Sequence, residues 1–472
     1  MTKTYDLTRG NSTELILKFF FPMLFTNMLQ QIYTIADTAI VGKGLGDNPL
    51  AAVGNMSSLT FLIIGFSAGL TNGFSVKIAQ YFGAGNKEKL RRSTASSVML
   101  SFVIAVLLTV LSVIFLKPIL ILMQTSELII SDSLIYGYII FGGLSATIAY
   151  NLCASILRAL GDSKTPFYAI IASTIINIVF NTVTIFVMKL GVEGPAIATV
   201  VSQFISALIC FMKIRKIDIL RITADDFKNN AEMVIKLLKN GIPMAVMNSI
   251  TAVGCMTVQY FVNGMGVVYT SAYSACSKYI NLFMQPACTA GYTMSSFTSQ
   301  NYGAKKYDRI LSGLKVCLSI ATISYVLLGS VMILFSRELA SLMLNGDEQI
   351  ILASQFLKKC GFMIFAVDFL FVFRSGCQGL GKPLLPMISG IIEMVLRVAV
   401  IAVFTSSVGF AATAYAEMAA WLGALAINVG AFAFYMHKNI NLQKKSIDNA
   451  DINCHNHFNF GYLRNVQSQN TK

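Results

Sequence analysis

Charged side chains are scarce in this chain of 472 residues: they make up 12% of it, while hydrophobic residues make up 55%. A soluble globular domain carries about 25% charged residues, so this chain cannot cover a water-facing surface of its size. Its apolar runs are instead close to the ~20 residues that a helix needs to cross a bilayer. The runs are uniformly apolar and do not alternate as transmembrane β-strands do. We predict an all-α polytopic membrane protein.

Several chemical motifs are missing as well. The nine cysteines contain no CxxC pair, so the sequence predicts neither a zinc site nor a disulfide framework. "VGKGLG" follows an apolar run without a βαβ unit, and no GxxxxGK[ST] motif is present. No catalytic constellation stands out. We expect no enzyme activity, no cofactor and no direct drive by ATP, and we interpret Cys454, His455 and His457 as part of a solvated tail.

The apolar runs predict twelve membrane spans. The first run is too long for a signal peptide and lacks a cleavage site after it, so we expect it to stay as the first span. The predicted limits are 15–41, 49–82, 91–116, 131–159, 165–188, 192–214, 236–264, 270–302, 311–334, 350–379, 384–405 and 410–437.

Lysine and arginine predict the orientation of these spans. They concentrate in alternate loops, such as "GNKEKLRR", "GAKKYDR" and "KIRKIDILRITADDFKNN". Because cytoplasmic loops carry an excess of these residues, both termini should be cytoplasmic. The net charge of +14 mostly reflects this asymmetry, and its spread over many loops gives no reason to expect a nucleic-acid partner.

The second half of the chain repeats the first at a shift of about 220 residues. "FPMLF" aligns with "IPMAV", "AQYFGAG" with "SQNYGAK", and "ALGDSKTP" with "GLGKPLLP". Six spans followed by six in the same orientation form a parallel repeat, whose halves rock to give alternating access. We predict an N-terminal lobe (1–212), a cytoplasmic linker (213–235), a C-terminal lobe (236–440) and a disordered cytoplasmic tail (441–472).

Asp37 is the most informative polar residue, because a carboxylate near the bilayer centre costs at least ~2.5–3.5 kcal/mol. Asn177 and Asn181 lie four residues apart on one helical face, and Thr199 lies at a comparable depth in the next span. Oxygen ligands of this kind suit Na⁺, or a proton held on the carboxylate. Alternatively, the asparagines form hydrogen bonds between helices. The carboxylate favours the ion site.

The repeat predicts that ion binding is confined to the first lobe. The counterpart of Asp37 lies near Val258, and that of Asn177 is Arg397. The second lobe therefore lacks the oxygen cluster.

Other polar residues in the predicted spans suggest further roles. Asp368 and Lys278 are candidates for a substrate cavity, where Asp368 would attract cationic substrates. Glu393 and Arg397, four residues apart, are spaced for an internal ion pair. Pro22 should bend the first span, as a hinge or as a static kink.

The two six-span halves, "ADTAIVGKGLG", and the paired turns "LGDSKTP" and "LGKPLLP" resemble the multidrug and toxic compound extrusion (MATE) family, and among its members the MepA-like bacterial branch. The resemblance covers about residues 10–440. It implies two six-helix bundles facing each other in a V, which export bulky organic cations against Na⁺ or H⁺.

By position, the resemblance implies a cation site at Asp37, Asn177, Asn181 and Thr199, and it matches Asp368 to an aspartate of the NorM-like branch. The acidic residue that this branch carries in its seventh span is absent here, in agreement with a single ion site.

We therefore expect a multidrug efflux antiporter in the bacterial cytoplasmic membrane, sufficient as a monomer. A flippase for lipid-linked precursors remains an alternative; it would need several arginines in its cavity, and Arg374 and Arg397 are the candidates. A receptor or scaffold that transports nothing is a second alternative, which would leave the oxygen cluster unexplained.

Overall fold

The computed structural model describes residues 6–228 and 230–469, and their side chains as far as residue 443. In this part of the chain every regular element is a helix, which confirms the predicted all-α fold. The first repeat contains α1 (Ser12–Leu45), α2 (Asp47–Gly83), α3 (Lys87–Leu122), α4 (Glu127–Gly142), α5 (Leu144–Ala159), α6 (Lys164–Thr182), the π-helix η1 (Val183–Val187) and α7 (Glu193–Arg215).

Two short 3₁₀-helices, η2 (Asp218–Leu220) and η3 (Ala224–Phe227), lie in the linker. The second repeat contains α8 (Ala231–Met265), α9 (Val267–Phe283), α10 (Gln285–Gly303), α11 (Tyr307–Ser324), the π-helix η4 (Tyr325–Gly329), α12 (Ser330–Leu334), α13 (Ser336–Ser341), α14 (Asp347–Gly379), α15 (Leu384–Val408) and α16 (Ala411–Gln469).

The helices agree with the predicted spans. In the described residues nine helical segments are long and apolar enough to cross a membrane, and α4 with α5, bent by 44°, makes a tenth. The bend occurs at Gly143, where a Cβ atom would lie 2.3 Å from Val200 Cγ2 of α7. The two other predicted spans, 270–302 and 350–379, are helical as α9–α10 and α14, which carry more polar and charged residues.

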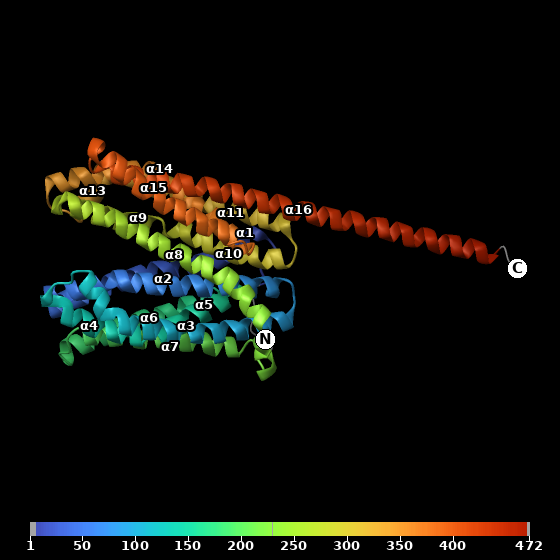
Figure 1. Cartoon of the computed structure of the whole chain (residues 1–472), viewed down its shortest axis with the longest axis horizontal. Helices are drawn as coiled ribbons and strands as arrows, with labels where there is room; N and C mark the ends of the chain where they lie inside the picture. The colour runs from blue at the N-terminus through green and yellow to red at the C-terminus, as the bar shows by residue number, and fades with distance from the viewer. Residues whose placement is uncertain (1–5, 229, 470–472) are drawn as a thin grey trace.

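Figure 1 shows two bundles of helices, with α3–α7 in one and α9–α16 in the other. α1 and α8 each take part in both. Ile16 and Phe20 near the start of α1 pack among buried residues of α10, α11, α14 and α16, whereas Val41 packs in the first repeat. Leu237 in α8 packs against α2, and Val262 packs in the second repeat. The predicted lobe limits stay a prediction, but the first helix of each repeat joins the two bundles.

Small residues allow α2 and α8 to approach closely. A Cβ atom on Gly69 would lie 2.6 Å from Ala245 Cα, and one on Gly73 would lie 2.4 Å from Gly241 Cα. Glycines four residues apart on one face are the common device for bringing two membrane helices into backbone contact. This contact holds the first half of α8, the first helix of the second repeat, against the first bundle.

A second contact between the bundles lies at the predicted cytoplasmic end, and we call it the latch. Gln80 Nε2 donates a hydrogen bond to the carbonyl of Gly379 (3.0 Å), and Gln300 Nε2 donates one to the carbonyl of Ala159 (2.8 Å). The two donors occupy equivalent positions of the two repeats, and so do the two acceptors, so the internal repeat relates one bond to the other. The motifs that reveal the repeat in the sequence thus hold the two bundles together.

Residues Leu7–Gly10 lie across the second repeat at the same end. Leu7 N–H donates to Gln300 Oε1 (2.9 Å), and Lys306 Nζ donates to the carbonyl of Thr8 (2.8 Å). Arg309 Nη1 donates to the carbonyl of Gly10 (2.8 Å). The chain before α1 is therefore anchored to α10 and α11.

The last helix continues beyond the bundles as far as Gln469 (Figure 1). The side chains after residue 443, including those of Cys454, His455 and His457, lie outside the described residues. That the tail is disordered stays a prediction.

The latch predicts the effect of two alanine substitutions. A Cβ atom on Gly83 would lie 1.9 Å from the carbonyl oxygen of Gln300, and one on Gly303 would lie 1.9 Å from that of Gln80. Overpacking costs about 1–3 kcal/mol, so Gly83→Ala and Gly303→Ala should each push the bundles apart here. Hydrogen exchange of residues 80–86 and 300–306 should become about tenfold faster or more.

Gly54→Ala in α2 is the matched control, because nothing lies within 4 Å of a Cβ atom built there. If hydrogen exchange at the latch is equally fast in Gly83→Ala, Gly303→Ala and Gly54→Ala, the prediction is wrong.

Candidate functional site

The structure brings the four predicted ion-site residues together from α1, α6 and α7. Asn181 Nδ2 donates hydrogen bonds to Asp37 Oδ1 and, at 3.0 Å, to Asn177 Oδ1. Asn177 Nδ2 lies 3.5 Å from Thr199 Oγ1. A carboxylate, two amides and a hydroxyl therefore form one continuous cluster.

Tyr33 completes this cluster. Its hydroxyl shares a hydrogen bond of 3.1 Å with Thr199 Oγ1. Tyr33 precedes Asp37 by four residues and so projects from the same face of α1. The spacing could have indicated this tyrosine, although an aromatic residue in a membrane helix is more often a packing residue.

The cluster lies beside an irregular turn of the helix that follows α6. Asn177 and Asn181 occupy one face of α6, directly before the π-helix η1, and single π-turns are frequent at functional sites. Gly44 allows α1 to approach that turn, since a Cβ atom on it would lie 2.4 Å from Ile185 Cγ2.

The cluster contains an oxygen atom without a hydrogen-bond partner and a carboxylate without an ion pair among the described residues. Asn177 and Asn181 are fully buried, and Asp37 is 9% exposed. Asn181 Oδ1 is buried and has no hydrogen-bond partner. No lysine or arginine of the described residues forms an ion pair with Asp37. An unneutralised carboxylate beside an unused amide oxygen is a donor set for a small cation or a proton.

The two predicted substrate-cavity residues lie apart from this cluster and are not linked to each other by a bond in the described part of the chain. Asp368 of α14 is 1% exposed, and its Oδ1 is buried without a hydrogen-bond partner. Lys278 of α9 is exposed. A cavity role for either residue stays a prediction.

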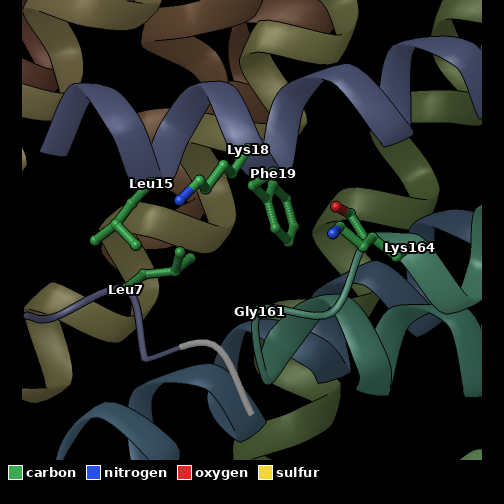
Figure 2. A pocket seen from close by; sticks show the side chains of 7 residues that line it. Leu7, Leu15, Lys18, Phe19, Gly161 and Lys164 are labelled. Atoms are coloured by element: carbon green, nitrogen blue, oxygen red, sulfur yellow. The ribbon is translucent and has the colours of Figure 1, made fainter. Parts of the chain in front are cut away.

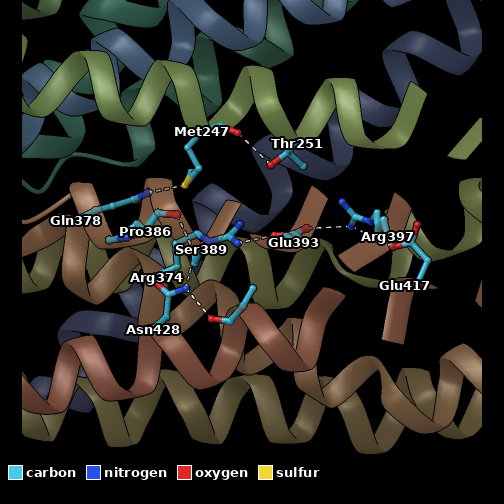
Figure 3. Close-up of polar contacts among 11 residues, drawn as sticks. Met247, Thr251, Arg374, Gln378, Pro386, Ser389, Glu393, Arg397, Glu417 and Asn428 are labelled. Carbon is cyan, nitrogen blue, oxygen red and sulfur yellow. Dashed lines mark hydrogen bonds and ion pairs between the residues drawn. The ribbon is translucent and has the colours of Figure 1, made fainter. Parts of the chain in front are cut away.

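Four charged residues of the second repeat form a buried chain of alternating sign (Figure 3). Arg374 Nη2 lies 2.6 Å from Glu393 Oε2, and Glu393 Oε1 lies 2.9 Å from Arg397 Nη2. Arg397 in turn lies 3.0 Å from Glu417 Oε2. All four side chains are buried. The predicted Glu393–Arg397 pair is confirmed, and the chain of four is electrically neutral.

Two pockets are lined by residues other than those of the two clusters. The interlobe pocket, about 130 Å³, is lined by α1, α2 and α5 of the first repeat and by α10 of the second. Its lining is Met23, Thr26, Asn27, Gln30, Ala68, Thr71, Asn72, Tyr150, Asn151, Ser155, Arg158 and Tyr292. A second pocket, about 190 Å³, lies between Leu7, the start of α1 and the turn Gly161–Lys164 (Figure 2).

Comparison with known proteins identifies the family. The model of the MatE family matches the chain twice, over residues 22–183 and 243–403. The chain belongs to the MatE family. The starts of the two matches, and likewise their ends, are separated by the shift predicted for the internal repeat.

Relatives and solved structures agree with this membership in a family of membrane transporters. The chain is 33% identical to the "Probable multidrug resistance protein YoeA" of Bacillus subtilis, over 72% of this chain and 75% of that protein. It is 20% identical to the "Multidrug export protein MepA" of Staphylococcus saprophyticus, over 80% of this chain and 84% of that protein. The fold is similar to that in "Crystal structure of MATE in the bent conformation", with a TM-score of 0.87, 22% identity, and coverage of 95% of this chain and all of that one.

Sequence reasoning missed the latch glutamines and Arg158 of the MatE chain. Gln80 and Gln300 are identical in the two repeats, so the alignment of the halves could have indicated them. Arg158 stands at the end of a span, where an arginine normally indicates only the cytoplasmic side.

The buried charge chain generates a prediction about stability. Glu393 accepts from both Arg374 and Arg397, so Glu393→Gln leaves buried positive charge uncompensated. Breaking a buried pair in this way costs about 3–5 kcal/mol. The detergent-solubilised variant should therefore unfold at a clearly lower temperature than the parent.

The control is Glu232→Gln, which removes an exposed pair with Lys236 on α8; exposed pairs contribute about 0–1 kcal/mol. Equal unfolding temperatures for Glu393→Gln and Glu232→Gln would refute a structural role for the chain of four.

Proposed function

We propose that this protein is a multidrug efflux antiporter that exports amphipathic organic cations in exchange for inward Na⁺ or H⁺. The observation that carries the proposal is the Asp37 cluster. Asp37 has no cationic partner among the described residues, and the neighbouring Asn181 Oδ1 has no hydrogen-bond donor. Na⁺ would be held by these oxygens with Asn177 and Thr199, and H⁺ would be held by the carboxylate.

α1 offers a route from ion binding to substrate release. It carries Asp37 near its end and contributes Met23, Asn27 and Gln30 to the interlobe pocket. Pro22 lies just before the pocket residues, where α1 passes from one bundle to the other. A cation at Asp37 would change the charge that the second half of α1 buries, and Pro22 would allow that half to move.

The latch supports alternating access. It closes the bundles against each other at the predicted cytoplasmic end, so this conformation would be open to the outside. A cation that enters from outside would favour this outward-open conformation, provided that it binds the outward-open and inward-open conformations with different affinity. Its release to the cytoplasm would accompany opening of the latch.

The names of relatives support export of drugs, since both relatives are named for multidrug resistance or multidrug export. We place the protein in the bacterial cytoplasmic membrane with both termini inside, and a monomer is sufficient because one chain supplies both bundles. Asp368 and Lys278 are proposed to interact with the charge of the substrate in a substrate cavity.

The flippase alternative receives no support from Arg374 and Arg397. Both side chains are buried and engaged with Glu393 and Glu417. They are therefore not in position to bind a pyrophosphate in a cavity.

Asp37→Asn tests the proposal. The substitution keeps the shape of the side chain and removes its charge, so efflux of a fluorescent organic cation from proteoliposomes should fall to the leak of empty liposomes. A Na⁺ gradient and a pH gradient are imposed separately on the parent, and the gradient that drives its efflux identifies the coupling ion.

Asp347→Asn at the exposed start of α14 makes the same charge change at the predicted outer end and should export like the parent. Undiminished efflux by correctly inserted Asp37→Asn would refute the assignment of the ion site.

Pro22→Ala tests the hinge. Alanine restores the backbone N–H that proline lacks and removes its clash with the preceding turn, so α1 should become straighter and stiffer. We expect efflux to slow several-fold while the protein still binds the coupling ion. Pro118→Ala, at an exposed proline of α3 outside the bundle junction, is the control; equal rates for both variants would show that Pro22 is a static kink.

A further inference from the structure

The interlobe pocket contains a positive charge that the proposed function leaves unused. Arg158 is the one charged residue among those that line the pocket. The side chain is half-buried. It lies between helices of the two repeats, away from the lipid-facing position expected of an arginine that serves only to orient a span.

Arg158 is held in place by hydroxyl and amide groups rather than by a carboxylate. Its Nη2 donates to Ser155 Oγ (3.2 Å), and Ser155 Oγ donates to Asn72 Oδ1 (3.0 Å). No aspartate or glutamate of the described residues forms an ion pair with it. The nearest acid in the sequence, Asp162, accepts from the backbone N–H groups of Lys164 and Thr165.

The position of Arg158 explains how the charge is tolerated without a carboxylate. It lies in the last turn of α5, where the unpaired carbonyl groups of a helix favour a cation. A guanidinium has five N–H donors in a planar fork. One of them binds Ser155, which leaves others for a ligand.

A second donor stands on the same face of α5. Asn151 lines the pocket, and its Nδ2 is buried without a hydrogen-bond partner. Asn151, Ser155 and Arg158 are spaced by four and three residues, so they follow one stripe of the helix. The pocket therefore presents a row of donors that ends in a positive charge.

We propose that the interlobe pocket binds an anionic group of the transported molecule, a carboxylate or a phosphate, on Arg158, with Asn151 as a second donor. This inference rests on the proposed export function and narrows its substrate class. Organic cations that also carry an acidic group, and are thus zwitterions, are bound in preference to those that carry a positive charge alone.

The latch gives Arg158 a place in the transport cycle. The next residue, Ala159, accepts the hydrogen bond from Gln300, so Arg158 lies directly beside the closed contact between the bundles. When the latch opens, the guanidinium is among the first groups that a molecule from the cytoplasm meets. Asp37 lies seven positions beyond Gln30, the last α1 residue that lines the pocket, or about 10 Å along the helix. The coupling cation would therefore be held outside the pocket that holds the anionic group.

The test measures equilibrium binding of two dyes that differ in one group. A rhodamine with a free carboxylate and its methyl ester are titrated with purified protein in nanodiscs of phosphatidylcholine, and fluorescence polarisation reports the Kd. The parent should bind the carboxylate dye more tightly. Arg158→Gln should weaken that binding about tenfold, as expected for loss of a charge-assisted hydrogen bond, and should leave binding of the ester unchanged. Arg158→Lys should lie between the two.

Arg337→Gln, at an exposed arginine of α13, is the control for lost charge and should behave like the parent. Unchanged binding of the ester also establishes that Arg158→Gln has kept its fold. A parent that prefers the ester, or an Arg158→Gln variant that binds both dyes as the parent does or weakens both equally, would overturn the inference.

Two further arms separate the possible causes of failure. Nanodiscs that contain anionic phosphatidylglycerol test whether a lipid headgroup takes the site; a carboxylate preference abolished by that lipid would assign Arg158 to the headgroup and overturn the inference. The binding assay needs no ion gradient. Selective binding therefore supports the anion site even where gradient-driven efflux fails, and efflux without selective binding leaves export intact and refutes the anion site.

Discussion

The bilayer interior contains no water, so every polar group placed there must find its partner inside the protein. The two repeats of this MatE-family chain meet that constraint differently. The second repeat balances its buried charges in a row of four, from Arg374 to Glu417. Among the described residues, the first repeat leaves Asp37 without a cationic partner and Asn181 Oδ1 without a donor. The second repeat thus pairs four of its buried charged residues with one another, whereas Asp37 in the first repeat and Asp368 in the second have no ion-pair partner among the described residues.

The two halves are connected by the helices that begin them. α1 and α8 each start in one bundle and end in the other, and each carries a proline within its first half, Pro22 and Pro243. Backbone contact through Gly69 and Gly73 holds α8 against α2. A bundle cannot change its tilt without displacing the first helix of the other. The open charge at Asp37 is therefore placed on an element whose movement both bundles share.

The sequence predicts the architecture well because the bilayer simplifies the rules. Long apolar runs become helices, and three repeated motifs show the duplication. The clustering of the four proposed ion-site residues could be predicted because a carboxylate in an apolar run is conspicuous, and because Asn177 and Asn181 are four residues apart.

The features that could not be predicted are contacts between residues that are far apart in the sequence and close together in the fold. The partners of Gln80 and Gln300 are backbone carbonyls in the opposite repeat, and no residue pattern marks a carbonyl. Nothing in the sequence singles out Arg158, because an arginine at the end of a span is expected from the excess of lysine and arginine on the cytoplasmic side. The break in the fourth span occurs at Gly143, which lies close to Val200 of α7; composition does not reveal this proximity.

The latch has an energetic consequence. A typical hydrogen bond within a protein contributes about 0.5–1.5 kcal/mol net, so the two bonds from Gln80 and Gln300 hold the bundles with only a few kcal/mol at most. A single positive charge that crosses a membrane potential of about 100 mV releases about 2.3 kcal/mol. The net free energy of these two bonds is thus of the same size as the work that one inward cation would supply under the proposed exchange. In the proposed transport cycle, a pair of neutral amide–carbonyl bonds suits a contact that opens and closes, whereas the row of buried ion pairs in the second repeat suits a part of the bundle that stays packed.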